Sequence, residues 1–214
     1  MEGALVGVLA AAALLPLLGA ARSLSMHRHP PDVALVCGGC VERELAAVRA
    51  GGSCRPRVRA TVVSSGACDL ARLDGARAPG DAPVLEDRRA MCTVSNMTSL
   101  LRDFRRARVR HVLVLTSAEH APRAFSAAQI VFRAYGIAVS CQRVPVQHDR
   151  SGEGREAMWR VVRDAVRALL FALVGADMGV AKLTRWIHPE RERASREWNA
   201  HRPSLHLPAR RAAS

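Results

Sequence analysis

The sequence predicts an α/β protein with a three-layer, Rossmann-like and mostly parallel sheet, helices on both faces, and a preceding N-terminal hydrophobic helix. Short apolar runs alternate with stretches of helical periodicity, and Gly, Pro and Asp are frequent in the connections. The runs are apolar at nearly every position, which is typical of strands covered on both faces. A chain of 214 residues, 49% of them hydrophobic, can bury a substantial core.

Five apolar runs are expected to be strands, at residues 33–37, 58–63, 83–85, 112–115 and 137–141. Helical periodicity lies between them, at residues 41–50, 93–106 and 121–135. We therefore expect an α/β domain over residues 30–180 and a basic, mobile tail over residues 181–214. Residues 69–81 and 147–154 are expected to be loops.

The N-terminus begins with an apolar run over residues 3–21, bounded by Glu2 and Arg22. About 20 apolar residues are enough to span a bilayer. A cleaved targeting peptide is the competing interpretation. Secretory signals normally carry Lys or Arg before the apolar run, however, and none precedes it here. We expect residues 1–25 to form a single membrane-spanning anchor. Arg22 and Arg28 would keep the domain on the cytosolic or stromal side.

The net charge of +13 would suit a nucleic-acid partner, but its origin argues against one. The basic residues are arginines except for Lys182, a skew typical of biased coding composition. Such a bias spreads charge over the surface instead of gathering it along a phosphate backbone. No nucleic-acid-binding motif is present and only 4% of residues are aromatic, so we expect no nucleic-acid partner. The sequence indicates no oligomeric state.

A helix is also expected near the C-terminus, from Glu156 to Val174, because apolar residues recur there at helical spacing. We expect this helix to pack on the sheet through its apolar side chains. Lying on a membrane surface or packing against a partner helix are the alternatives. The residues that form the apolar pattern are Trp159, Val162, Val166, Leu169, Leu170 and Leu173.

Four polar segments are expected to meet at one edge of the sheet, because the carboxyl ends of parallel strands lie together. Glycines there let a ligand approach the backbone, and hydroxyl groups can hydrogen-bond to it. His120 and Arg123 come at the start of a helix, where anions are favoured, and Arg123 can balance a negative charge. This pattern predicts a phosphate or carboxylate site, with these ligand-binding candidates: Gly38, Gly39, Ser64, Ser65, Gly66, Thr93, Asn96, Thr116, Ser117 and Arg123.

The candidate catalytic residues are His120, a general acid or base near neutral pH, and Glu86, which could orient it or act as its partner. The alternative is that Glu86 and Asn96 only hold loops by hydrogen bonds. Cys37 and Cys40 form a C-G-G-C motif, which can be a redox pair, but we expect this one to be coincidental. The histidines lack ligand spacing, so no metal site is predicted, and no particular cofactor is indicated.

The order of these residues resembles a family of uncharacterised proteins that includes SanA, ElyC and YdcF. The family pattern is a glutamate, then T-x-x-N, then a strand, then T-S-x-x-H-x-x-R-A, which matches Glu86, Thr93 to Asn96, and Thr116 to Ala124. The resemblance covers residues 32–145 and looks closest to the cyanobacterial and algal, plastid-lineage branch. Ser95 replaces a glutamate common in the bacterial pattern, and Glu119 replaces an aromatic residue.

The resemblance implies a membrane-anchored domain with a role in envelope or membrane metabolism, and in the plastid-lineage branch a plastid location. Together with the predicted anion site, it suggests a phosphorylated or nucleotide-like small molecule as the ligand. The family has no settled reaction. Two functions therefore stay open: a small enzyme acting on such a ligand, and a non-catalytic regulatory or partner-binding module at a membrane.

Overall fold

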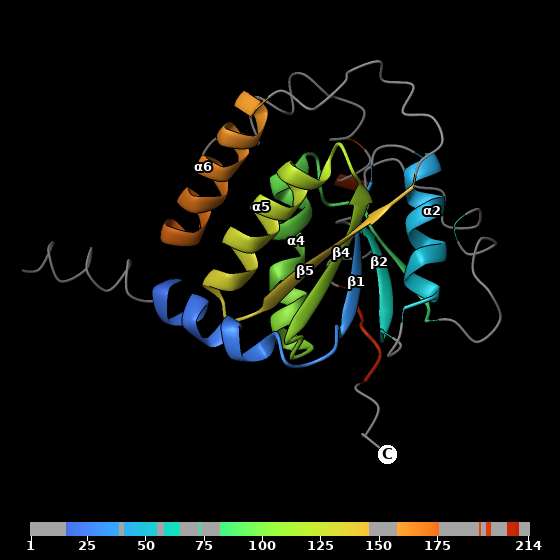
Figure 1. Cartoon of the computed structure of the whole chain (residues 1–214), viewed down its shortest axis with the longest axis horizontal. Helices are drawn as coiled ribbons and strands as arrows, with labels where there is room; N and C mark the ends of the chain where they lie inside the picture. Colours follow the sequence, from blue (N-terminus) through green and yellow to red (C-terminus); the bar gives the residue numbers. More distant parts are fainter. Residues whose placement is uncertain are drawn as a thin grey trace, which may run out of the picture.

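A five-stranded sheet forms the centre of the protein, with helices on both of its faces (Figure 1). The strands are β1 (Val33–Cys37), β2 (Ala60–Ser64), β3 (Val84–Asp87), β4 (His111–Ser117) and β5 (Ala138–Val144). The helices are α2 (Val41–Gly52), α4 (Thr93–Arg106), α5 (Ala121–Ala134) and α6 (Met158–Val174), and a further helical segment covers residues 16–26. The structure is a computed structural model that describes residues 16–38, 41–54, 58–64, 73, 82–145, 158–175, 193, 196–197 and 205–209.

All neighbouring strands pair in parallel, in the order β3-β2-β1-β4-β5. The chain runs outward from β1 through β2 to β3, and then crosses to the other side of β1 to form β4 and β5. The direction of winding therefore reverses between β1 and β4. Such a switch point, beyond the carboxyl ends of the strands, is where sheets of this kind usually bind ligands. The predicted α/β fold with a parallel sheet is confirmed.

The side chains of β1 alternate between two hydrophobic cores, one on each face of the sheet. Val33 and Leu35 belong to the larger core, which they form together with α4 and α5. Ala34 and Val36 belong to the smaller core, which includes residues of α2. The three predicted layers are therefore present, with α4 and α5 over one face and α2 over the other.

Strand β4 is longer than predicted and determines where the site lies. The expected strand ended at Leu115 because the two following residues are polar. The structure continues it through Thr116 and Ser117, and Ser117 pairs with Val144 of β5. Backbone pairing does not require an apolar side chain, so the ladder continues beyond the apolar run. The hydroxyl groups of both residues are thereby buried inside the sheet edge.

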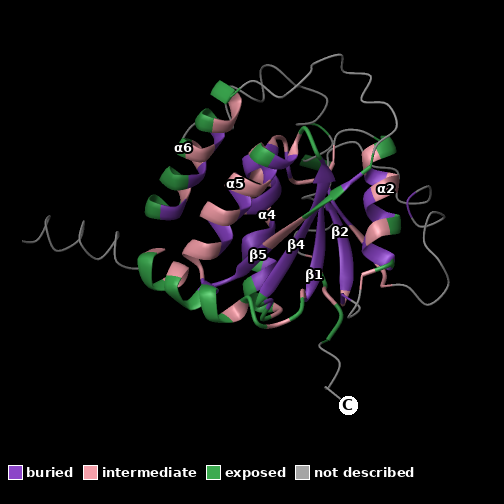
Figure 2. Ribbon diagram, in the orientation of Figure 1, coloured by how far each residue is buried: buried purple, intermediate pink, exposed green. Residues whose placement is uncertain are grey.

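Helix α6 forms an outer layer on α5 and α4 instead of packing on the sheet. Its buried side chains are Asp164, Ala168 and Ala172. The small alanines let α5 approach closely, and the large apolar side chains lie on the opposite, exposed face (Figure 2). The expectation that these side chains pack on the sheet is wrong for all six of them: Trp159, Val162, Val166, Leu169, Leu170 and Leu173.

The helical segment of residues 16–26 lies against the end of α5. A Cβ atom at Gly19 would come 2.0 Å from the carbonyl oxygen of Ala134, so the two backbones are in direct contact there. The Nε of Arg133 donates to the hydroxyl of Ser23 over 3.1 Å. Residues 1–15, which hold most of the predicted anchor, lie outside the described residues. Among the described segments, none of the helices is long and apolar enough to cross a membrane.

Candidate functional site

The predicted site residues that the structure describes lie along the carboxyl edge of the sheet or at the start of a helix that follows it. Gly39, Ser65, Gly66 and Cys40 lie outside the described residues. The described residues come from the strand ends and from the first turns of α4 and α5: Gly38, Ser64, Glu86, Thr116, Ser117, Thr93, Asn96, His120 and Arg123.

Glu86 and His120, the predicted catalytic pair, are separated by the strand order. Glu86 lies in β3 at one edge of the sheet, and His120 follows β4, with β2 and β1 between them. Strands are spaced by about 4.8 Å, so the two backbone segments are about 14 Å apart. Glu86 is also buried in an ion pair with Arg88. The topology therefore argues against a direct hydrogen bond between Glu86 and His120.

On the β2 and β3 side, a buried carboxylate that the sequence analysis missed organises the edge. Asp87 is fully buried, and its Oδ2 accepts hydrogen bonds from Ser64 (3.2 Å) and Ser99 (2.8 Å). Its Oδ1 accepts from the Nε of Arg89 over 2.6 Å, and Arg89 also binds Asp103 at 2.6 Å. Both carboxylate oxygens are therefore occupied. We call these five residues the Asp87 cluster.

The charges of the Asp87 cluster are matched inside the protein. Burial alone would lower the pKa of Arg89, but the charges and hydrogen bonds of Asp87 and Asp103 outweigh burial and raise it. The guanidinium thus remains charged, and it holds both carboxylates through separate nitrogens. A buried group with this many internal partners holds the structure together and offers little to a ligand.

Ser64 and Cys37 are poorly suited to act as nucleophiles. The Ser64 hydroxyl has one proton, and Asp87 can only accept it, so the Asn96 amide, 3.3 Å away, satisfies Ser64 best by presenting its nitrogen. Burial raises the pKa of the Cys37 thiol to about 12, against the opposing effects of Arg43 and an Asn96 hydrogen bond. A thiol that stays protonated at neutral pH is unreactive.

The β1 and β4 side differs, because polar groups there are buried without partners. Thr116 and Ser117 are 0% and 4% exposed, and neither hydroxyl has a hydrogen-bond partner within the described chain. Val36 pairs with Leu115, so continuing that register places Thr116 beside Cys37 and Ser117 beside Gly38. Both residues therefore lie at the end of β4 beside the switch point, with their hydroxyls on opposite faces of the sheet.

Arg43, in the first turn of α2, brings a positive charge to the switch point. One of its terminal nitrogens donates to the carbonyl of Gly38 over 3.3 Å. Its Nε is buried and has no hydrogen-bond partner among the described residues. Arg43 was not predicted as a site residue, because it stands between Glu42 and Glu44, where an arginine is readily interpreted as part of a surface ion pair. We call Gly38, Arg43, Thr116 and Ser117 the switch-point cluster.

Arg123, which the sequence analysis placed in the ligand site, forms an ion pair with α6. Its Nε donates to Asp164 over 2.5 Å. Asp164 is fully buried and also pairs with Arg163 (2.9 Å) and Arg167 (3.6 Å). Arg123 therefore has a structural role between two helices, and a ligand would have to compete with Asp164 for it.

The fold and the switch-point cluster together define the class: a parallel α/β protein with a candidate anion site at its topological switch point. No group of three or more His, Cys, Asp or Glu side chains that could hold a metal ion occurs within the described residues. No protein-family model, no curated protein and no solved structure matches the chain.

Proposed function

We propose that this protein binds a phosphorylated or nucleotide-like small molecule at the switch-point cluster. The observation that carries the proposal is the presence of three buried polar atoms without partners in the described chain: Thr116 Oγ1, Ser117 Oγ and Arg43 Nε. Each can donate a hydrogen bond, and Arg43 adds a positive charge, so each suits a phosphate oxygen. Ser117 lies on the α2 face of the sheet with Arg43, and Thr116 lies on the opposite face, so a ligand that uses all three would have to sit across the end of β4. Leaving such groups buried and unpaired costs stability, which a bound anion would restore.

The biological context of the proposal is membrane or envelope metabolism. It is supported by the resemblance to the family of SanA, ElyC and YdcF, whose pattern places residues at this same sheet edge. The apolar run over residues 3–21 also suits a membrane setting, but residues 16–21 of it lie against α5, which leaves residues 3–15, fewer than the about 20 needed for a span. In the plastid-lineage branch the corresponding location would be a plastid membrane.

A non-catalytic regulatory or partner-binding module is the second candidate, and two observations favour it over an enzyme. Two strands separate Glu86 from His120, so this pair is poorly placed for proton transfer. Burial also keeps the Cys37 thiol protonated. Binding is therefore the core of the proposal, and turnover is a question for experiment.

Calorimetric titration of the full-length chain with inorganic phosphate, ADP, glucose 6-phosphate and a polyprenyl phosphate tests the proposal. We expect at least one of these to bind, and Arg43→Gln to weaken its affinity about 10- to 100-fold, the typical effect of losing a charged hydrogen bond. The matched control is Arg49→Gln, because Arg49 lies on the same helix and is exposed. No binding of any probe, or equal loss in the control, would refute the proposal.

Release of phosphate from any compound that binds separates an enzyme from a binding module. Since His120 precedes α5 and is half-buried, His120→Asn keeps a polar side chain at the helix start. An enzyme is indicated if the wild type turns the compound over and His120→Asn binds it without turnover. Binding without turnover by the wild type supports the module.

A further inference from the structure

The exposed face of α6 is apolar along its whole length. At 100° per residue, its large apolar side chains fall within an arc of about 160°. They are 39–72% exposed, and their opposite face is the one that packs on α5. The residues of this apolar face are Met158, Trp159, Val162, Val166, Leu169, Leu170, Leu173 and Val174.

Arginines border the apolar face on the side toward α4. Arg160, Arg163 and Arg167 follow next on the helical wheel, and the first two lie against the ring of Trp159, at 5.9 and 5.1 Å. Beyond them lies an open groove of about 630 Å³ between α4, α6 and the end of α5. The apolar face is therefore bordered by arginines, although Arg163 and Arg167 also pair with the buried Asp164 and the Arg167 side chain is only 10% exposed.

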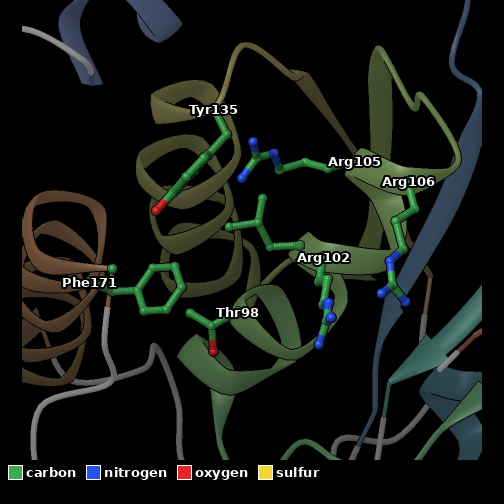
Figure 3. A pocket seen from close by; sticks show the side chains of 8 residues that line it. Thr98, Arg102, Arg105, Arg106, Tyr135 and Phe171 are labelled. Carbon is green, nitrogen blue, oxygen red and sulfur yellow. The ribbon is translucent and has the colours of Figure 1, made fainter. Parts of the chain in front are cut away.

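The groove continues this positive border. Its lining includes Arg102, Arg105 and Arg106 of α4, all exposed, together with Tyr135 and Phe171 (Figure 3). The guanidinium of Arg105 lies 5.4 Å from the centre of the Tyr135 ring. Among the described residues, no acidic side chain lines the groove and no carboxylate pairs with these three arginines. Such a surface attracts phosphate groups.

We propose that α6 docks this protein on an anionic membrane surface, with its apolar face among the acyl chains and the bordering arginines among the lipid phosphates. An apolar helical face with a basic border is the pattern of helices that lie in the membrane interface. A second copy of the chain could cover the apolar face, but it would bring its own arginines against these. The positive border therefore favours an anionic surface over a second copy.

The helical segment of residues 16–26 supports the same orientation. It contacts the end of α5 near Ala134. Phe171 of α6 lies against the neighbouring Tyr135, with 6.5 Å between the centres of the two rings. Leu17 and Leu18 are 66% and 58% exposed, and the segment lies near the C-terminal end of α6 (Figure 1). Two exposed apolar surfaces therefore occupy one side of the protein.

Docking through α6 would also place the first turn of α5 close to the membrane. Asp164, on the inner face of α6, pairs with Arg123 in the first turn of α5. A helix with its side chains is about 10 Å across. The ion pair, on the protein side of α6, would therefore lie about one helix diameter from the lipid surface. The docking inference does not depend on the proposed function, because it rests on different residues.

Fluorescence of Trp159 in the full-length chain tests the docking. Trp186→Phe and Trp198→Phe leave Trp159 as the only tryptophan, and the vesicles contain brominated phosphatidylcholine with or without 30% phosphatidylglycerol. We expect a blue shift and strong quenching with the anionic vesicles, and a several-fold weaker response with neutral vesicles or in 0.5 M salt. Quenching should be lost in the double variant Val166→Glu and Leu169→Glu.

Matched controls and the opposing outcomes complete the test. Val41→Glu changes another exposed apolar residue, on α2 at the opposite face of the sheet, and should leave the quenching unchanged. Circular dichroism checks that each variant is folded. If the protein sediments with vesicles while Trp159 is not quenched, the N-terminal run anchors it and the docking inference fails. A blue shift that grows with protein concentration in the absence of lipid would instead identify a second copy as the partner.

Discussion

The Asp87 cluster and the switch-point cluster lie on two halves of the carboxyl edge and both bury polar residues, but they differ in whether those residues have partners. In the Asp87 cluster every charge and hydroxyl group has a partner from the protein. In the switch-point cluster, Thr116, Ser117 and Arg43 bury polar atoms that the described chain leaves unsatisfied. Buried polar residues at the carboxyl edge of the sheet are therefore not by themselves a site. The residues left without partners indicate where a ligand belongs.

The largest effect on the free energy of unfolding is expected for Asp87→Ala, which removes the carboxylate at the centre of the Asp87 cluster. Arg89 would lose one of its two carboxylate partners, and the hydroxyl groups of the buried Ser64 and the half-buried Ser99 would lose their acceptor. We expect a loss of about 3 to 5 kcal/mol in the free energy of unfolding, measured by urea denaturation. A loss below about 1 kcal/mol would show that the Asp87 cluster is not what holds this half together.

Asp164→Ala tests whether Arg123 has a structural role, like the residues of the Asp87 cluster, instead of a ligand-binding role. Removing Asp164 leaves Arg123 partly buried without this carboxylate, whereas Arg123→Ala leaves Asp164 with two other arginines. We expect Asp164→Ala to cost about 2 to 3 kcal/mol and Arg123→Ala about 1 kcal/mol, again by urea denaturation. Equal costs would mean that Arg163 and Arg167 do not support Asp164.

Cys37 lies between the two clusters, and its raised pKa makes the free energy of unfolding depend on pH in the alkaline range. The unfolded chain releases the thiol proton near the ordinary pKa of 9.0, but the native protein holds it until about 12. Native protein therefore binds more protons between these values, and the free energy of unfolding falls as pH rises. Between pH 8 and pH 10 we expect the free energy of unfolding to fall by about 1 kcal/mol more in the wild type than in Cys37→Ala, because the raised pKa of Cys141 contributes equally to both.

The smallest change in stability is expected for Thr116→Val, and it contrasts most directly with Asp87→Ala. Valine has nearly the same shape and removes a hydroxyl group that has no partner in the described chain. We expect the free energy of unfolding to stay the same or rise by up to about 1 kcal/mol. Phosphate affinity should fall in the same variant. A destabilised Thr116→Val protein would show that the hydroxyl group has a structural partner.

The matched control for Thr116→Val is Ser126→Ala. Ser126 lies on α5 and bonds to the carbonyl of Pro122 within its own helix. Its loss should leave phosphate affinity unchanged, because the hydroxyl group does not face the switch point.

Much of the fold could be predicted because apolar patterns are local. The predicted bounds of α4 match the structure, and β1 was predicted residue for residue. Glu86 lies near the carboxyl end of β3, and Thr93 and His120 lie at the starts of α4 and α5, as the alternation of strands and helices predicts, while their role in a site stays a prediction. Arg43 and Asp87 were missed, since neither stands in a pattern that distinguishes it from an ordinary surface or strand-end residue.

The parallel α/β class, the order of the elements and the residues available at the carboxyl edge follow from local sequence patterns. Which of those residues have partners depends on contacts between distant segments, which the folded structure shows. Asp164 pairs with Arg123 across 41 positions of sequence, and Ser64 with Asp87 across 23. The folded structure also shows that the apolar face of α6 points outward, because α5 accepts the alanine face. Periodicity shows that a helix has two faces, but the neighbouring elements determine which face is buried.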